Sequence, residues 1–99
     1  MSNLIWEKVE NCFSGSQTYQ YILDSSTDDA FLDALSTLGI LEVKRNFRRP
    51  FFFLRIDDNS EVRGTLGDNR IKASFPNESW ESSKLSFEKG LEKALEVLA

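Results

Sequence analysis

The sequence predicts an α+β fold: a two-layer sandwich in which helices pack on one face of a mostly antiparallel sheet. Three observations indicate this class. Two segments carry apolar residues at helical spacing, and four segments between them alternate apolar and polar residues as half-buried strands do. The links between those strands consist of residues that turns prefer. Because 99 residues suffice for one hydrophobic core, we expect a single domain spanning residues 1–99.

The first fifteen residues fit two alternatives. A helix would place four apolar residues on one face: Ile5, Val9, Cys12 and Phe13. In the other alternative, the Ser-Gly-Ser of residues 14–16 is a hairpin turn that joins a strand over 4–13 to the strand predicted at 18–23. We favour the helix slightly, because Glu and Lys are poor strand formers. One or two N-terminal strands are therefore expected beside the rest of the sheet.

A helix is predicted to follow, beginning near Ser26 and ending near Gly39. A hydroxyl of Ser26 or Thr27 can cap its first backbone N–H groups, and Asp28 and Asp29 favour the positive end of the helix dipole. Its apolar face comprises Phe31, Leu32, Ala34, Leu35 and Leu38. A glycine commonly ends a helix in the left-handed conformation, which is the role expected of Gly39.

Four strands are predicted next, over residues 41–46, 50–57, 61–66 and 70–75. Asp-Asp-Asn-Ser at 57–60 and Gly-Asp-Asn at 67–69 are typical turn sequences, so the strands should form an antiparallel meander. The chain then ends in a second helix with an apolar stripe of Leu85, Phe87, Leu91, Ala94, Leu95 and Leu98. Lys84 and Glu88 are expected on its outer side, and Ser79, Ser82 or Ser83 is expected to cap it. Gly90, inside the stripe, indicates a close contact with the sheet.

Alternation assigns the meander residues to two faces. The core face comprises Leu41, Val43, Phe52, Leu54, Ile56, Val62, Gly64, Leu66, Ile71, Ala73 and Phe75. The opposite face carries nearly all the basic charge of the middle of the chain, two phenylalanines, and Glu42 and Glu61 as its acids. Its predicted partner-binding residues are Lys44, Arg49, Phe51, Phe53, Arg55, Arg63, Arg70 and Lys72. A slip of one residue would reverse the two faces.

The charge along the chain is uneven. Residues 1–43 carry one basic and seven acidic side chains, whereas residues 44–72 carry eight basic and four acidic ones. A chain with a net charge of −4 thus contains a basic middle third, which bears on the partners it attracts.

Composition disfavours an enzyme. Histidine, the usual general base and commonest metal ligand, is absent, and the single cysteine, Cys12, has no histidine to activate it. The carboxylates fall in turns, in a helix cap and on a helix face. We therefore expect no catalytic residues, no metal and no cofactor. With no secretory leader and no membrane-spanning apolar run in the sequence, a cytoplasmic location is expected.

Three interpretations of the basic and aromatic face compete. It can be an ordinary solvated sheet face covered by long Arg and Lys stems. It can be a surface for a protein partner or for a second copy of the chain, since Phe and Arg are common at interfaces. It can also bind single-stranded nucleic acid, with aromatics stacking on bases and cations on phosphates. Our hypothesis is a small non-enzymatic protein-interaction module, with nucleic-acid binding as the alternative.

Overall fold

The computed structural model describes residues 5–9, 16–24 and 26–98. In chain order its elements are β1 (Ile5–Lys8), β2 (Ser16–Ile22), α1 (Asp29–Leu35), the short 3₁₀ helix η1 (Ser36–Leu38), β3 (Ile40–Lys44), β4 (Phe51–Arg55), β5 (Glu61–Thr65), β6 (Arg70–Pro76) and α2 (Trp80–Leu98). The α+β class predicted from the sequence is confirmed.

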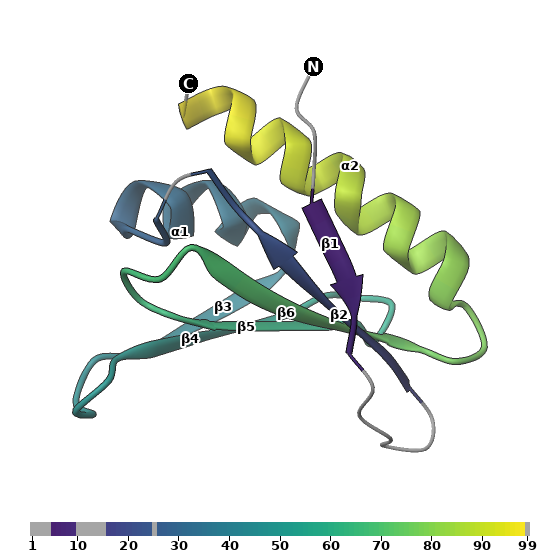
Figure 1. Ribbon diagram of the computed structural model, residues 1–99, viewed down its shortest axis with the longest axis horizontal. Helices are drawn as coiled ribbons and strands as arrows, with labels where there is room; N and C mark the ends of the chain where they lie inside the picture. Colours follow the sequence, from purple (N-terminus) through teal and green to yellow (C-terminus); the bar gives the residue numbers. More distant parts are fainter. Residues whose placement is uncertain (1–4, 10–15, 25, 99) are drawn as a thin grey trace.

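The strands form one antiparallel sheet in the order β1-β2-β6-β5-β4-β3 (Figure 1). Strands β3 to β6 are the predicted meander, in which each strand pairs with the next in sequence. Strand β2 pairs with β6, at the far end of the meander from β3. The chain therefore crosses the sheet between β2 and β3, and α1 and η1 lie on this crossover.

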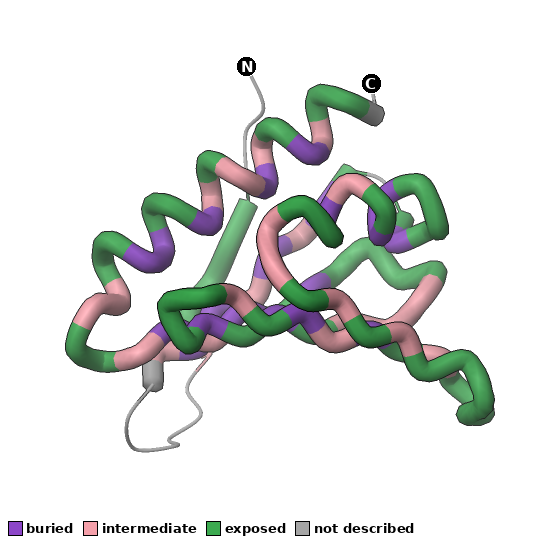
Figure 2. Tube along the Cα trace, turned by 180° about the vertical axis from the view of Figure 1, so that it is seen from behind, coloured by how far each residue is buried: buried purple, intermediate pink, exposed green. Residues whose placement is uncertain are grey.

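Both helices lie on the same side of the sheet, with α2 against β6 and α1 against α2 (Figure 1). The core lies between the two layers, and buried positions alternate along the strands (Figure 2). The predicted core face is confirmed: its large residues are fully buried on β4, β5 and β6, and Leu41, Val43, Ile56 and Leu66 pack at its margin. The side chains of the opposite face point away from the helices, and we call this surface the outer face.

The N-terminal segment is a strand, so the preference for a helix was wrong. Strand β1 pairs antiparallel with β2, with Ile5 opposite Ile22 and Lys8 opposite Tyr19. Trp6 packs edge-on against Tyr19, with ring centroids 5.4 Å apart. Sheet pairing and this aromatic contact outweigh the low strand propensity of Glu and Lys. Cys12 and residues 14 and 15 of the predicted hairpin turn lie outside the described residues, whereas Ser16 is the first residue of β2.

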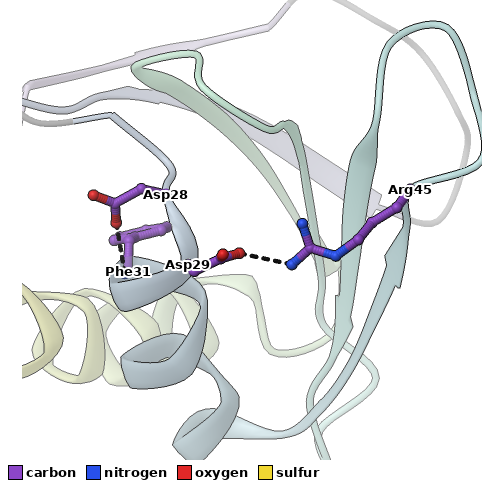
Figure 3. A network of polar contacts seen from close by, with 4 residues as sticks. All are labelled: Asp28, Asp29, Phe31 and Arg45. Carbon is purple, nitrogen blue, oxygen red and sulfur yellow. Dashed lines mark hydrogen bonds and ion pairs between the residues drawn. The ribbon is translucent and has the colours of Figure 1, made fainter.

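The start of α1 differs from the prediction in its capping residue. The carboxylate of Asp28 accepts the hydrogen bond from the Phe31 N–H, at 2.9 Å (Figure 3). Thr27 is fully buried, and its hydroxyl instead donates to the backbone carbonyl of Thr65 at 2.7 Å. Asp29, in the first turn, accepts from Arg45 at 2.6 Å, which links the start of α1 to the end of β3.

Two glycines have roles other than those expected. Gly39 is extended (φ 176°) and not left-handed, and a Cβ there would collide with the carbonyl oxygen of Arg55. A Cβ on Gly90 would lie 2.7 Å from a methyl group of Leu38, so the close contact of α2 is with η1 and not with the sheet. Gly64 does face the core, where it leaves room for the ring of Phe52.

Helix α2 buries a lysine and exposes a leucine, contrary to the predicted stripe. Leu85 is 56% exposed, whereas Lys84 is 9% exposed. The Lys84 amine lies 3.7 Å from the centre of the Trp6 ring and 2.7 Å from the Glu88 carboxylate. The stripe is therefore rotated toward β1, a segment for which a helix was slightly preferred over a strand. The side chain of Leu98 lies outside the described residues.

The turn between β4 and β5 is closed by Asp58, whose carboxylate accepts the Ser60 N–H at 3.0 Å. Burial alone would raise the pKa of Asp58, but the backbone N–H of Ser60, which donates to the carboxylate, and the nearby Ser60 and Ser83 side chains lower it below its ordinary value. Because its pKa is lower in the folded state, the Asp58 carboxylate stabilises the fold at pH values above the unfolded-state pKa, near 3.9. This contribution is lost as the pH falls through the folded-state pKa.

We therefore expect Asp58→Asn to reduce the free energy of unfolding at neutral pH by about 0.5–1.5 kcal/mol. The difference from the wild-type chain should shrink as the pH falls from about 4 through the lowered folded-state pKa, because the wild-type carboxylate is protonated over this range, first in the unfolded and then in the folded state. Urea unfolding at several pH values measures both quantities. A difference that stays constant down to acid pH would contradict the role given to the charge.

Candidate functional site

The outer face carries the basic and aromatic residues as predicted. Its outward positions are Lys44 on β3, Phe51, Phe53 and Arg55 on β4, Arg63 on β5, and Arg70 and Lys72 on β6. Arg49 is exposed in the link between β3 and β4. The strand register is the one the alternation predicts, because Phe52 and Leu54 are fully buried while Phe51 is 37% exposed.

A shallow concavity of about 480 Å³ lies on this face, and we call it the basic concavity. It is lined by Gln20, Phe51, Arg63, Gly64, Thr65, Asp68, Arg70 and Lys72. Four of the eight predicted partner-binding residues therefore meet at one place: Phe51, Arg63, Arg70 and Lys72. A volume of this size is in the range of small-molecule and side-chain binding sites.

The strand register explains why the cations gather. Arg63 on β5 lies directly opposite Lys72 on β6, and Arg70 lies two residues before Lys72 on the same side of the same strand. Like charges opposite each other on neighbouring strands destabilise a sheet. Within residues 5–9, 16–24 and 26–98, none of these three cations forms an ion pair with a carboxylate. Their positive charge is thus concentrated and left uncompensated by contact pairs.

The other four predicted residues lie outside the basic concavity. Lys44 forms an exposed ion pair with Glu42, at 3.5 Å. The guanidinium of Arg55 lies 5.7 Å from the centre of the Phe53 ring, and Arg55 is paired in register with Glu61. Arg49 is not among the lining residues. These four side chains do not contribute to the wall of the concavity.

The predicted set lacked four of the lining residues, Gln20, Gly64, Thr65 and Asp68, and it also lacked Phe47, which is not part of the lining. Phe47 is 57% exposed and packs on Phe51, with ring centroids 5.3 Å apart. A signal for it exists, since it lies among arginines just before the most apolar strand. Gln20 and Asp68 reach the concavity only because β2 pairs with β6 and the 67–69 turn folds beside β5. The pairing of β2 with β6 cannot be deduced from local sequence, whereas the turn at 67–69 was predicted, although Asp68 was not assigned to the binding set.

No group of three His, Cys, Asp or Glu side chains that could hold a metal ion occurs in the part of the chain that the structure describes. Neither helix is long and apolar enough to cross a membrane, again for the described residues. What the outer face offers chemically is hydrogen-bond donors, positive charge and aromatic surface. This combination suits the binding of an anionic group.

Comparison with known proteins adds no assignment: the chain matches no family model, no curated protein and no solved structure.

Proposed function

We propose that this protein is a small non-enzymatic interaction module that binds an acidic segment of a partner protein on the outer face of its sheet. The basic concavity is the observation that carries the proposal. Arg63, Arg70 and Lys72 lie together beside an exposed phenylalanine, on a chain whose net charge is −4. Arginine and aromatic side chains are enriched in the energetically dominant parts of protein interfaces.

A partner of opposite charge fits this face better than a second copy of the chain. A symmetric dimer through the outer face would bring the same patch of both copies together. The Arg63, Arg70 and Lys72 side chains of both copies would then lie in one desolvated interface, where like charges repel strongly. Charge complementarity therefore favours a different, acidic chain.

Single-stranded nucleic acid is the rival, with Phe51 and Phe53 stacking on bases and Lys44, Arg70 and Lys72 contacting phosphates. Carboxylates lie at both ends of one row of residues that crosses the basic region. The row that contains Lys72, Arg63 and Phe53 continues to Glu42 on β3, and through Gln20 to Glu7 on β1. A polyanion laid across the strands along this row would meet a carboxylate at each end. A compact acidic group would not, which favours the protein segment.

Charge reversal at the centre of the concavity tests the proposal. We expect Arg63→Glu to weaken the binding of a fluorescent peptide of glutamates with one central phenylalanine by about tenfold or more, since an attraction becomes a repulsion. Phe51→Ser combined with Phe53→Ser should weaken it similarly by removing the aromatic surface. Fluorescence anisotropy measures both affinities. Lys93→Glu, the same charge change on an exposed part of α2, is the matched control and should bind as the wild type does.

Each other outcome has a defined meaning. If the acidic peptide does not bind, or if it binds all variants equally, the outer face is an ordinary solvated surface and the proposal is wrong. Tighter binding of a labelled oligothymidine, with an affinity that falls steeply as salt rises, would establish the nucleic-acid alternative in its place. A solution molar mass of a dimer that Phe51→Ser converts to a monomer would establish self-association instead.

A further inference from the structure

The basic concavity holds more positive charge than one carboxylate would neutralise. Its lining contains three cations, Arg63, Arg70 and Lys72, and one carboxylate, Asp68, which gives a net charge of +2. The Asp68 carboxylate accepts the backbone N–H of Asn69 at 2.7 Å, so it is oriented by its own turn. An aspartate or glutamate ligand would leave half of this charge unmatched.

From this charge and from the shape of the site we infer that the group recognised is a phosphorylated side chain, with phosphotyrosine fitting best. The inference rests on the proposed function and specifies its ligand. A phosphate monoester carries a charge between −1.5 and −2 at neutral pH and offers three strong acceptor oxygens. Arg63 and Arg70 can each present two parallel N–H donors to such a group, while Lys72 adds a point charge.

The aromatic wall distinguishes phosphotyrosine from phosphoserine. Phe51 lines the same concavity as the three cations. Phe47, in the link between β3 and β4, packs on the Phe51 ring. A phosphotyrosine whose phosphate meets the cations can place its own ring on Phe51, whereas phosphoserine has no ring to offer. A volume of about 480 Å³ is far larger than a phosphate ion requires, and it leaves room for that ring.

The cross-strand pair of Arg63 and Lys72 supports a binding role over a structural one. Two cations opposite each other lower the stability of the unliganded sheet, and a bound dianion would remove that repulsion. Residues kept for stability should destabilise the fold when their charge is removed. Residues kept for binding should leave the fold unharmed or more stable, and this difference is measurable.

The test uses the whole chain and three small probes: phenyl phosphate, inorganic phosphate and benzoate. Titrations followed by NMR of the arginine side chains give the three affinities. We expect phenyl phosphate to bind about tenfold more tightly than either of the others, because only it combines the dianion with an aromatic ring. A peptide with a central phosphotyrosine should likewise exceed the same peptide carrying phosphoserine, tyrosine or glutamate at that position.

Arg63→Gln should abolish this preference for phenyl phosphate while leaving the melting temperature in phosphate-free buffer equal to or above that of the wild type. Lys93→Gln, which removes an exposed charge on α2, should change neither quantity. A lower melting temperature for both Arg63→Gln and Lys72→Gln would overturn the inference by showing that the cations are structural. Benzoate or inorganic phosphate binding as tightly as phenyl phosphate would overturn it too.

The two levels of the hypothesis fail in different ways. If the glutamate peptide binds the outer face in an Arg63-dependent manner but phosphorylation adds nothing, the phosphotyrosine inference fails and the interaction module stands. If neither the glutamate peptide nor any phosphorylated probe binds, both fail.

Discussion

Replacing Phe52 with alanine is expected to lower the free energy of unfolding by about 3–5 kcal/mol. Phe52 is fully buried on β4, where Val43 and Gly64 are its partners on the two neighbouring strands. Its ring lies so close to Gly64 that a Cβ on the glycine would be 2.8 Å from it. Since paired strands hold the backbone on both sides, the structure cannot collapse into the space that the ring vacates. Urea unfolding followed by tryptophan fluorescence measures the loss.

Phe51→Ala is the matched control for this prediction. It removes the same ring from the adjacent position of the same strand, but on the outer face, where Phe51 is 37% exposed. We expect a loss below about 1 kcal/mol, because less apolar surface is returned to water and no internal cavity forms. Comparable losses for the two variants would contradict the assignment of their faces, and with it the composition of the basic concavity.

That assignment was accessible from the sequence because strand periodicity is a local property. Phe51, Phe52 and Phe53 are chemically identical, so only the alternation of their neighbours distinguishes them. On β5 and β6, charged or small polar residues alternate with apolar ones, namely Val62, Ile71 and Phe75. Because neighbouring strands of the meander pair side by side, these apolar residues lie on the same face of the sheet as Phe52. Turn sequences at 57–60 and 67–69 then fix which strands are neighbours.

Features that depend on contacts between distant segments were not accessible. Strand β1 is made of Ile-Trp-Glu-Lys, in which Glu and Lys are poor strand formers, and it is held by pairing with β2. Because β1 was not expected with certainty, nothing in the sequence indicated that Lys84 would be covered by Trp6. The helical stripe of α2 was accordingly placed too far toward Leu85.

The candidate site shows the same division. Alternation predicted which side chains share the outer face, but not which of them meet. Arg63 and Lys72 come together because the β5–β6 register pairs them, and Gln20 joins them because β2 returns to the edge of the meander at β6. Lys44 and Arg55, equally basic in the sequence, lie instead beside Glu42 and Glu61. Register and strand order therefore select four residues from the eight predicted.

Glu88 holds a polar network between α2 and the sheet, and its loss is the other change for which we expect a large effect. Its carboxylate accepts the Lys84 amine at 2.7 Å and the Tyr21 hydroxyl at 2.8 Å. The Lys84 and Glu88 side chains are 11% and 18% exposed, so both charges are largely removed from water. Burial, together with the hydrogen bond to Glu88, raises the pKa of Tyr21 and keeps its hydroxyl a donor.

We expect Glu88→Leu to lower the free energy of unfolding by about 2–4 kcal/mol, because it leaves a largely buried ammonium without its counter-ion and a buried hydroxyl without its acceptor. Glu88→Gln should cost less, since its amide oxygen can still accept from Tyr21 while the charge is lost. Chemical unfolding at neutral pH gives both values.

The double variant Lys84→Met with Glu88→Leu separates the charge from the packing. Removing both partners eliminates the uncompensated ammonium and leaves the apolar stem against Trp6, so the double variant should be more stable than Glu88→Leu alone. If the double variant is instead less stable than Glu88→Leu, by the full loss that Lys84→Met alone causes, the two side chains act independently. Lys84 would then stabilise the fold through its contact with the Trp6 ring, and the link between α2 and β1 would not depend on the ion pair.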